Sequence, residues 1–300
     1  MEALQGYLDQ LKASIVGNMP TTTLPQETSC PFDKCDGSMW KVVQLPGKGI
    51  SEVRCECYDF KLFQLSISDK CPHRECDGSG WTLFLDKENG VCRRKECKCL
   101  IQEIKQKRLD KHFKIARIPV KYLGKSLDNY EATPGTEQHT AWRMARRYVE
   151  RFQELRSEEK NGLFMFGNPG TGKSHLSYAI LQEMLKQGVA GICATVPDLM
   201  ESLRPGGDES QDTKKMLEAL KTMDLLILDD LGACKSTPWV TERVYIILNA
   251  RASNNLPTII TSNEDLDSLE AIPGWDRIVS RILGMTHVVP VHGEDYRKRK

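Results

Sequence analysis

The sequence has little net charge and no long apolar run. Its 300 residues carry 42 Lys and Arg against 41 Asp and Glu, a formal net charge of +1. The chain as a whole is therefore not a strongly basic nucleic-acid binder, and any such role must come from local patches. No apolar run approaches membrane-spanning length, and residues 1–7 lack the basic start and apolar core of a signal peptide. We expect a soluble, cytoplasmic protein without a membrane partner, with room for two domains.

Cysteine is nearly absent outside one segment. Nine of the eleven cysteines fall between Cys30 and Cys99, and only Cys193 and Cys234 lie beyond it. Clustered cysteines in a cytosolic chain indicate metal ligands rather than disulfides. The segment therefore predicts a metal-binding region.

That region contains an internal repeat. Residues 30–40 read CPFDKCDGSMW, residues 71–81 read CPHRECDGSGW, and a Cys-x-Cys pair follows each copy. Four thiolates at this spacing can meet one tetrahedral zinc ion, and in units with so little core the metal supplies much of the folding free energy. The pattern predicts two zinc ribbons, although an iron–sulfur cluster, or one site with remnants of a second, stays open because thiolates alone do not name the metal. The predicted ligands are Cys30, Cys35, Cys55 and Cys57, then Cys71, Cys76, Cys97 and Cys99, with Cys92 a spare or an alternative.

A glycine-rich loop dominates the second half of the chain. Residues 167–174 read GNPGTGKS, between an apolar run at 163–166 and apolar residues at helical spacing over 175–185. This strand–loop–helix context favours a phosphate-binding P-loop over an ordinary glycine-rich turn. Lys173 is expected to reach the β and γ phosphates, and the Ser174 hydroxyl to hold Mg²⁺. The predicted nucleotide-binding residues are Gly167, Asn168, Pro169, Gly170, Thr171, Gly172, Lys173, Ser174 and His175.

From about Asn161 onward strand and helix patterns alternate, which predicts an α/β fold with a parallel sheet covered on both faces. The predicted strands lie near 163–166, 190–195, 224–229, 257–262 and 286–291. The predicted helices lie near 173–187, 214–222, 238–252 and 275–283. Ser236 or Thr237, with Pro238, is expected to start the third helix.

Polar residues follow two of these strands. The third strand ends in Asp229 and Asp230, and the fourth is followed by Asn263. A buried strand that delivers two acids is typical of a Walker B motif, so Asp229 is expected to hold Mg²⁺ and Asp230 to orient or deprotonate the attacking water. The alternative, a pair of capping acids, is weak beside a P-loop. Asn263 is placed to position that water or to sense the γ-phosphate.

Basic residues are clustered along the chain. The run over 93–125 is either a solvated linker helix or a track for a phosphate backbone. A second set lies on a predicted helix with Trp142, Tyr148 and Phe152, which are expected to be core rather than base-stacking platforms.

Two later features concern the nucleotide. The Asn-Lys-x-Asp element that a G protein would carry for guanine is missing after the P-loop, which favours ATP. Arg277 and Arg281 stand four apart on a short helix and share a face. Arg281 is the better candidate for an arginine finger that completes a neighbour's ATP site, whereas a surface salt bridge suits Arg277.

Four stretches together resemble one family: GNPGTGKSHL, LLILDDLGACKSTPWVTERVYIILNAR, LPTIITSNEDLDSL and DRIVSRILG. They are similar to the AAA+ helicase loaders of the DnaC and DnaI type, with the IstB-type transposition helpers as near relatives, and the likeness covers roughly residues 115–300. The resemblance implies Lys173 and Ser174 as Walker A, Asp229 and Asp230 as Walker B, Asn263 as sensor 1 and Arg281 as the finger. It also implies ATP-dependent binding of single-stranded DNA, delivery of a ring helicase, and a fold without a C-terminal lid. The doubled ribbon departs from the single metal site of the family.

We therefore expect an N-terminal helix and linker over 1–27, a duplicated zinc-ribbon region over 28–100, a basic helical linker over 101–155 and an AAA+ ATPase domain over 156–300. The leading hypothesis is a slow, partner-stimulated ATPase that uses ATP, Mg²⁺ and two zinc ions. It would load a replicative DNA helicase onto single-stranded DNA and self-associate through the ATP site. The alternatives are a transposition helper ATPase and a metal-stabilised DNA-binding ATP switch, with a small-molecule P-loop kinase behind them.

Overall fold

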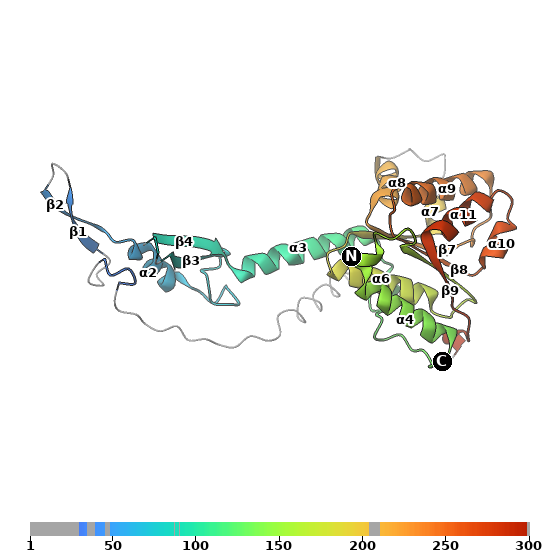
Figure 1. Ribbon diagram of the computed structural model, residues 1–300, viewed down its shortest axis with the longest axis horizontal. Helices are drawn as coiled ribbons and strands as arrows, with labels where there is room; N and C mark the ends of the chain where they lie inside the picture. Colours follow the sequence, from blue (N-terminus) through green and yellow to red (C-terminus); the bar gives the residue numbers. More distant parts are fainter. Residues whose placement is uncertain are drawn as a thin grey trace. The chain divides into compact units, whose positions relative to one another are not determined.

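A computed structural model describes residues 30–34, 40–45, 49–86, 88–89, 91–203 and 211–298 (Figure 1). The described residues divide into two compact units, one up to Arg108 and the other from Leu109 onward. The predicted helix near the start of the chain and the predicted ligand Cys35 lie outside the described residues. Within the described parts, no helix combines the length and apolar character needed to cross a membrane.

Five parallel strands form the sheet of the larger unit, in the order β6-β7-β8-β5-β9. They are β5 (Gly162–Phe166), β6 (Gly191–Thr195), β7 (Leu225–Leu231), β8 (Thr258–Ser262) and β9 (Thr286–Pro290). Their sequences are nearly continuous apolar runs because helices cover both faces of a parallel sheet. All five predicted strands are confirmed to within two residues at either end. The order places β5, which leads into the P-loop, between β8 and β9, so the strand order reverses beside it and opens a crevice at the carboxyl ends.

Helices cover both faces of this sheet (Figure 1). They are α4 (Glu137–Glu150), α5 (Phe152–Leu155), α6 (Lys173–Lys186), α7 (Val196–Ser202), α8 (Gln211–Thr222), α9 (Pro238–Ser253), α10 (Leu266–Glu270) and α11 (Asp276–Met285), with 3-10 helices η1 (Val120–Tyr122) and η2 (Tyr296–Lys298). Residues of α7 to α11 share one core with Phe164, Leu226 and Ile260, and α6 contacts β7 and β8. The four predicted helices are confirmed, and the Thr237 hydroxyl caps α9 by accepting from the Val240 N–H. The sequence did not predict α7 and α10, because helices this short show too little periodicity.

Among its described residues, the smaller unit contains two hairpins, one helix between them and the first part of a second helix, α3 (Lys98–Ala116). Strands β1 (Trp40–Leu45) and β2 (Gly49–Arg54) pair antiparallel, as do β3 (Trp81–Asp86) and β4 (Val91–Glu96), and α2 (Cys57–Ser66) lies between the hairpins in sequence. Its buried residues, among those described, are Cys30, Cys55, Cys57, Cys71, Cys76, Cys97, Gly80 and Thr82. The interior of this unit is therefore made mainly of cysteine sulfur.

The basic run over 93–125 is not one helix. It starts in β4, continues through α3 (Lys98–Ala116) and ends beyond η1. Tyr148 and Phe152 are buried, with 3% and 1% of their surface exposed, which confirms their prediction as core.

Arg251 is a fully buried cation that ties α8, α9 and β8 together. Its Nε donates to Thr258 Oγ1 (2.9 Å), and its terminal nitrogens donate to the carbonyl oxygens of Leu220 (2.9 Å), Met223 (3.0 Å) and Pro257 (2.7 Å). Burial lowers the pKa of Arg251 to about 9. The guanidinium thus replaces the water that these buried oxygens would otherwise bind.

Arg251→Met is expected to lower the free energy of unfolding by about 3 kcal/mol, because several buried acceptors would lose their donor. Urea denaturation followed by circular dichroism measures this. The control is Arg277→Met, at an exposed position, which should change the value by less than about 0.5 kcal/mol. An equal loss in both variants would mean that the buried hydrogen bonds do not stabilise the fold.

Candidate functional site

The predicted P-loop joins the end of β5 to the start of α6. Gly167, Gly170 and Gly172 have φ angles of 144°, 78° and 97°, in the region that favours glycine. A Cβ atom at Gly172 would lie 2.5 Å from the ring of Tyr130. The glycines therefore let the loop curl tightly, and its N–H groups and the helix N-terminus are suited to phosphate.

Lys173 is a buried cation whose partners are all neutral. It is 5% exposed, and its Nζ donates to the carbonyl oxygens of Gly167 (2.6 Å) and Asn168 (2.8 Å) and to Asn263 Oδ1 (2.9 Å). Burial lowers the pKa of Lys173 to about 8, against the opposing effect of the two β7 carboxylates. A buried ammonium that forms no ion pair with any described residue fits a phosphate group.

Asp229 lies at the base of the site and accepts three hydroxyl donors. Only 2% of it is exposed, and it bonds to Thr261 Oγ1 (2.5 Å), Ser174 Oγ (2.9 Å) and Tyr178 OH (3.2 Å). Burial raises the pKa of Asp229, and the charge of Asp230 adds to this, while the hydroxyl groups oppose it. The two predicted Mg²⁺ ligands, Ser174 and Asp229, are thus in contact, and their hard oxygen atoms suit that ion.

Asp230 adopts an unusual backbone conformation. Its φ is +58°, and the pairing of β7 with β8 shifts register between Leu228 and Leu231. The Asp230 N–H donates to Thr261 Oγ1 at 3.0 Å, and its side chain lines the pocket. A bulge re-aims side chains, and such strained positions gather at functional sites. With this bulge, Asp229 contacts Ser174 of the P-loop helix while Asp230 lines the pocket beside it.

The remaining predicted residues fall into different places. Pro169 through His175 line the pocket with Asn263. Gly167 and Asn168 do not line it, and their carbonyl oxygens accept hydrogen bonds from Lys173. The His175 imidazole Nε2 lies 2.8 Å from the carbonyl oxygen of Ser126, which ties the segment before α4 to the P-loop helix. Arg281 does not line this pocket; it is exposed on α11 and makes no ion pair with any described residue.

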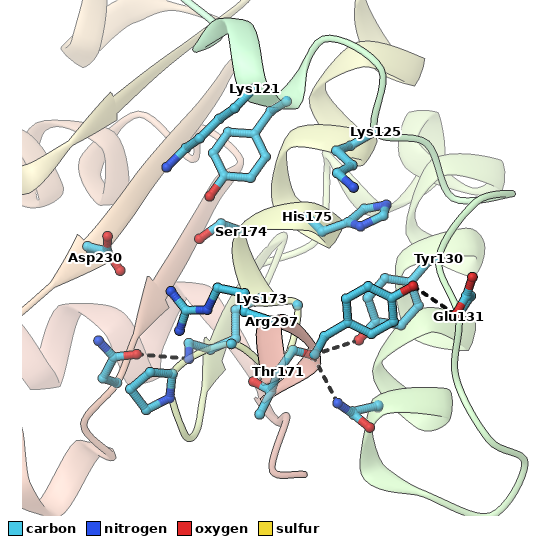
Figure 2. Close-up of a pocket in the computed structure, with 17 residues that line it drawn as sticks. Lys121, Lys125, Tyr130, Glu131, Thr171, Lys173, Ser174, His175, Asp230 and Arg297 are labelled. Atoms are coloured by element: carbon cyan, nitrogen blue, oxygen red, sulfur yellow. Dashed lines mark hydrogen bonds between the residues drawn. The ribbon is translucent and has the colours of Figure 1, made fainter. Parts of the chain in front are cut away.

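The pocket has walls that the sequence did not predict. Its cavity of about 360 Å³ lies at the carboxyl edge of the sheet (Figure 2). The additional lining residues are Lys121, Tyr122, Lys125, Tyr130, Glu131, Gln138, Tyr296 and Arg297. Tyr130 OH donates to the carbonyl oxygen of Thr171 (3.0 Å), and the Tyr296 N–H donates to that of Gly170 (3.0 Å). One segment that precedes the sheet in the sequence and one that follows it therefore both contact the P-loop. Arg297, in the second segment, adds a cation to the pocket.

ATP affinity is expected to fall by about tenfold per pH unit above pH 8, because the free protein must reprotonate Lys173 to bind phosphate. Below about pH 7 this group should have no effect, since it is then fully charged. Titration with a fluorescent ATP analogue at constant ionic strength measures the profile. In Lys173→Arg the guanidinium stays charged, so the decline should disappear. An unaltered protein with constant affinity up to pH 10 would contradict the assignment.

Cysteine side chains form two groups among the described residues. Cys71, Cys76, Cys97 and Cys99 have sulfurs within 4.8 Å of one another, as do Cys30, Cys55 and Cys57. The Sγ atoms are 3.7 Å apart for Cys71 and Cys97 and 3.4 Å apart for Cys76 and Cys99. A tetrahedron with zinc–sulfur bonds of about 2.3 Å has edges of about 3.8 Å. The second group in chain order, Cys71, Cys76, Cys97 and Cys99, has separations close to this value. The first group, Cys30, Cys55 and Cys57, is also compatible with a metal ion, and Cys92 belongs to neither group.

Comparison with known proteins places this site in a family. The model of the IstB-like ATP binding proteins matches residues 99–300. The replicative helicase loader DnaC of Escherichia coli K12 is 28% identical over 216 residues, which cover 71% of this chain and 84% of that protein. DnaC of Buchnera aphidicola from Acyrthosiphon pisum is 26% identical over 202 residues, 66% of this chain and 80% of that protein. A crystal structure of the DnaC helicase loader is 32% identical, with a TM-score of 0.50 over 57% of this chain and 98% of that one.

Proposed function

Since the chain belongs to the family of IstB-like ATP-binding proteins, we propose that it is a cytoplasmic ATPase that loads a hexameric replicative helicase onto single-stranded DNA. The observation that carries this proposal is the likeness to proteins named replicative helicase loader, which spans 84% of the length of one of them. The likeness to the DnaC crystal structure supports the same reading. The AAA+ fold and its nucleotide site supply the means of coupling ATP to that task.

The side chains of the site have complementary roles in this proposal. Lys173 binds the β and γ phosphates and leaves its bond to Asn263, whose amide is then available to the γ-phosphate or the attacking water. Ser174 and Asp229 hold Mg²⁺, which neutralises phosphate charge. Asp230, aimed by the β7 bulge, orients the water or accepts its proton. We assign the stabilisation of the departing charge to Arg281 of a neighbouring subunit, acting as an arginine finger.

Zinc is the ion that we propose for both cysteine groups. Closed sets of four sulfur ligands are typical of structural zinc, and the sulfur separations of the second group match it. In the first group Cys35 would supply the fourth sulfur, as the repeat predicts.

Arg281→Ala is expected to leave ATP affinity within about twofold and to lower partner-stimulated hydrolysis by about 1000-fold, as the loss of an arginine finger does. Steady-state phosphate release with helicase and DNA present measures hydrolysis. Arg277→Ala is the matched control, one turn earlier on α11 and also exposed. If the Arg281 variant hydrolyses ATP normally, or the Arg277 variant loses the same activity, the finger assignment is wrong.

Size-exclusion chromatography with light scattering tests the whole proposal. The protein is mixed with its host's replicative helicase, with and without ATP, and metal is assayed in the same fractions. A stable complex with two zinc ions per chain supports the proposed loader function. If the protein does not bind the helicase, the proposal is refuted. The family match favours a transposition helper as the second candidate, and a preference for duplex over single-stranded DNA would support that function.

A further inference from the structure

The second zinc ribbon exposes aromatic rings on its hairpin. Trp81 on β3 is 41% exposed and Phe84, on the same strand, is 37% exposed. The buried positions of this unit are occupied mainly by cysteine, so the rings have no core to enter. Exposed aromatic rings can serve as platforms on which unpaired bases stack.

Two cations of β4 lie over these rings. The Arg94 guanidinium is 5.5 Å from the centre of the Trp81 ring, and the Lys95 ammonium is 5.6 Å from the centre of the Phe84 ring. Neither Arg94 nor Lys95 forms an ion pair with a described carboxylate. Other cations of the same unit do form such pairs: Arg74 with Asp69 (3.0 Å), Arg93 with Asp86 (2.9 Å) and Lys107 with Glu103 (2.6 Å).

The register of the hairpin separates the two ring–cation pairs. Arg94 lies opposite Leu83 and Lys95 lies opposite Thr82, so Trp81 with Arg94 and Phe84 with Lys95 occupy opposite faces. β4 is an edge strand of this two-stranded sheet. A flexible chain that follows this edge can meet a ring and a positive charge on each side.

We propose that the β3–β4 hairpin binds single-stranded DNA without any need for nucleotide. Unpaired bases would stack on Trp81 and Phe84, and the phosphates between them would meet Arg94 and Lys95. Double-stranded DNA should bind this surface more weakly, because its bases are already stacked on one another and cannot stack on the rings. The choice of DNA over RNA rests on the proposed function, whereas the ring-and-cation surface does not.

Binding of a labelled oligothymidylate to the full-length, zinc-loaded Lys173→Ala protein, without nucleotide, isolates this site. Trp81→Ala in that background is expected to weaken binding about tenfold, as loss of one base-stacking ring does. Trp81→Phe should restore most of the affinity, and both variants should keep the zinc content of the parent. An oligouridylate and a duplex of equal length serve as competitors. Equal competition by the duplex, or no affinity in the Lys173→Ala parent, would overturn the proposal.

The salt dependence tests the two cations separately. Arg94→Gln with Lys95→Gln should lower the slope of log affinity against log salt by about 1.4, since each single-strand phosphate contact contributes about 0.7. Arg74→Gln with Lys107→Gln removes the same charge from ion-paired positions and should leave the slope unchanged. Equal effects in both pairs would show that net charge alone binds the DNA. If the protein binds single-stranded DNA through the hairpin but does not bind helicase, the proposed loader function is wrong and the hairpin site still stands.

Discussion

Lys173→Ala is expected to abolish ATP binding, with a loss of affinity of about 100-fold or more. The ammonium is buried and held by three neutral oxygen atoms, so phosphate meets a cation that the fold has already largely desolvated. A charge-assisted hydrogen bond contributes about 1.5–3 kcal/mol, and this ammonium can donate more than one to the phosphates. Titration with a fluorescent ATP analogue measures the loss.

Lys186→Ala is the matched control, because this lysine lies at the other end of α6 and pairs with Glu183 at 2.8 Å. It should bind ATP like the unaltered protein. Circular dichroism must show that the Lys173 variant is folded, because three oxygen atoms lose their donor when the ammonium is removed. ATP affinity that survives in a folded Lys173→Ala protein would show that the loop is not the nucleotide site.

The strands and their carboxyl ends could be predicted because each is a local pattern. An apolar run followed by GNPGTGKS fixes β5 and α6, and an apolar run ending in Asp229 and Asp230 fixes β7. Parallel strands end at the same edge, so the pattern also placed Asn263 beside the predicted nucleotide site, and its Oδ1 lies 2.9 Å from Lys173 Nζ. The register shift at Asp230 was not predictable, since it depends on how β7 pairs with β8.

The walls of the pocket could not be predicted either, because they too depend on how distant segments pack together. Tyr130 and Lys121 fall within the linker predicted to be helical over 101–155, but α3 ends at Ala116. They line the pocket because His175 and Thr171 bind the stretch that follows back onto the P-loop. The tail that carries Arg297 reaches the loop through Gly170. Contacts between segments 41, 49 and 126 residues apart leave no periodic trace in the sequence.

Cys76→Ser is expected to remove one of two zinc ions and to unfold the second ribbon while the ATPase unit stays folded. Cys76 is fully buried, and its sulfur lies 3.4 Å from that of Cys99, so serine would leave an incomplete ligand set at the centre of the ribbon. Structural zinc contributes about 10–16 kcal/mol of apparent binding free energy in small domains, far more than an interior of sulfur can supply by apolar burial. The larger unit has its own apolar core and should keep its ATP affinity.

Cys92→Ser separates zinc ligation from the general effect of losing a thiol. Cys92 is partly exposed on β4 and lies outside both sulfur groups, so this variant should retain two zinc ions per chain. Metal analysis of purified protein, together with limited proteolysis and ATP titration, distinguishes the outcomes. Zinc loss in the Cys92 variant would make it a ligand in place of a repeat-aligned cysteine. Loss of ATP binding in the Cys76 variant would mean that the ribbon supports the fold of the ATPase unit, and the two units would then not be independent.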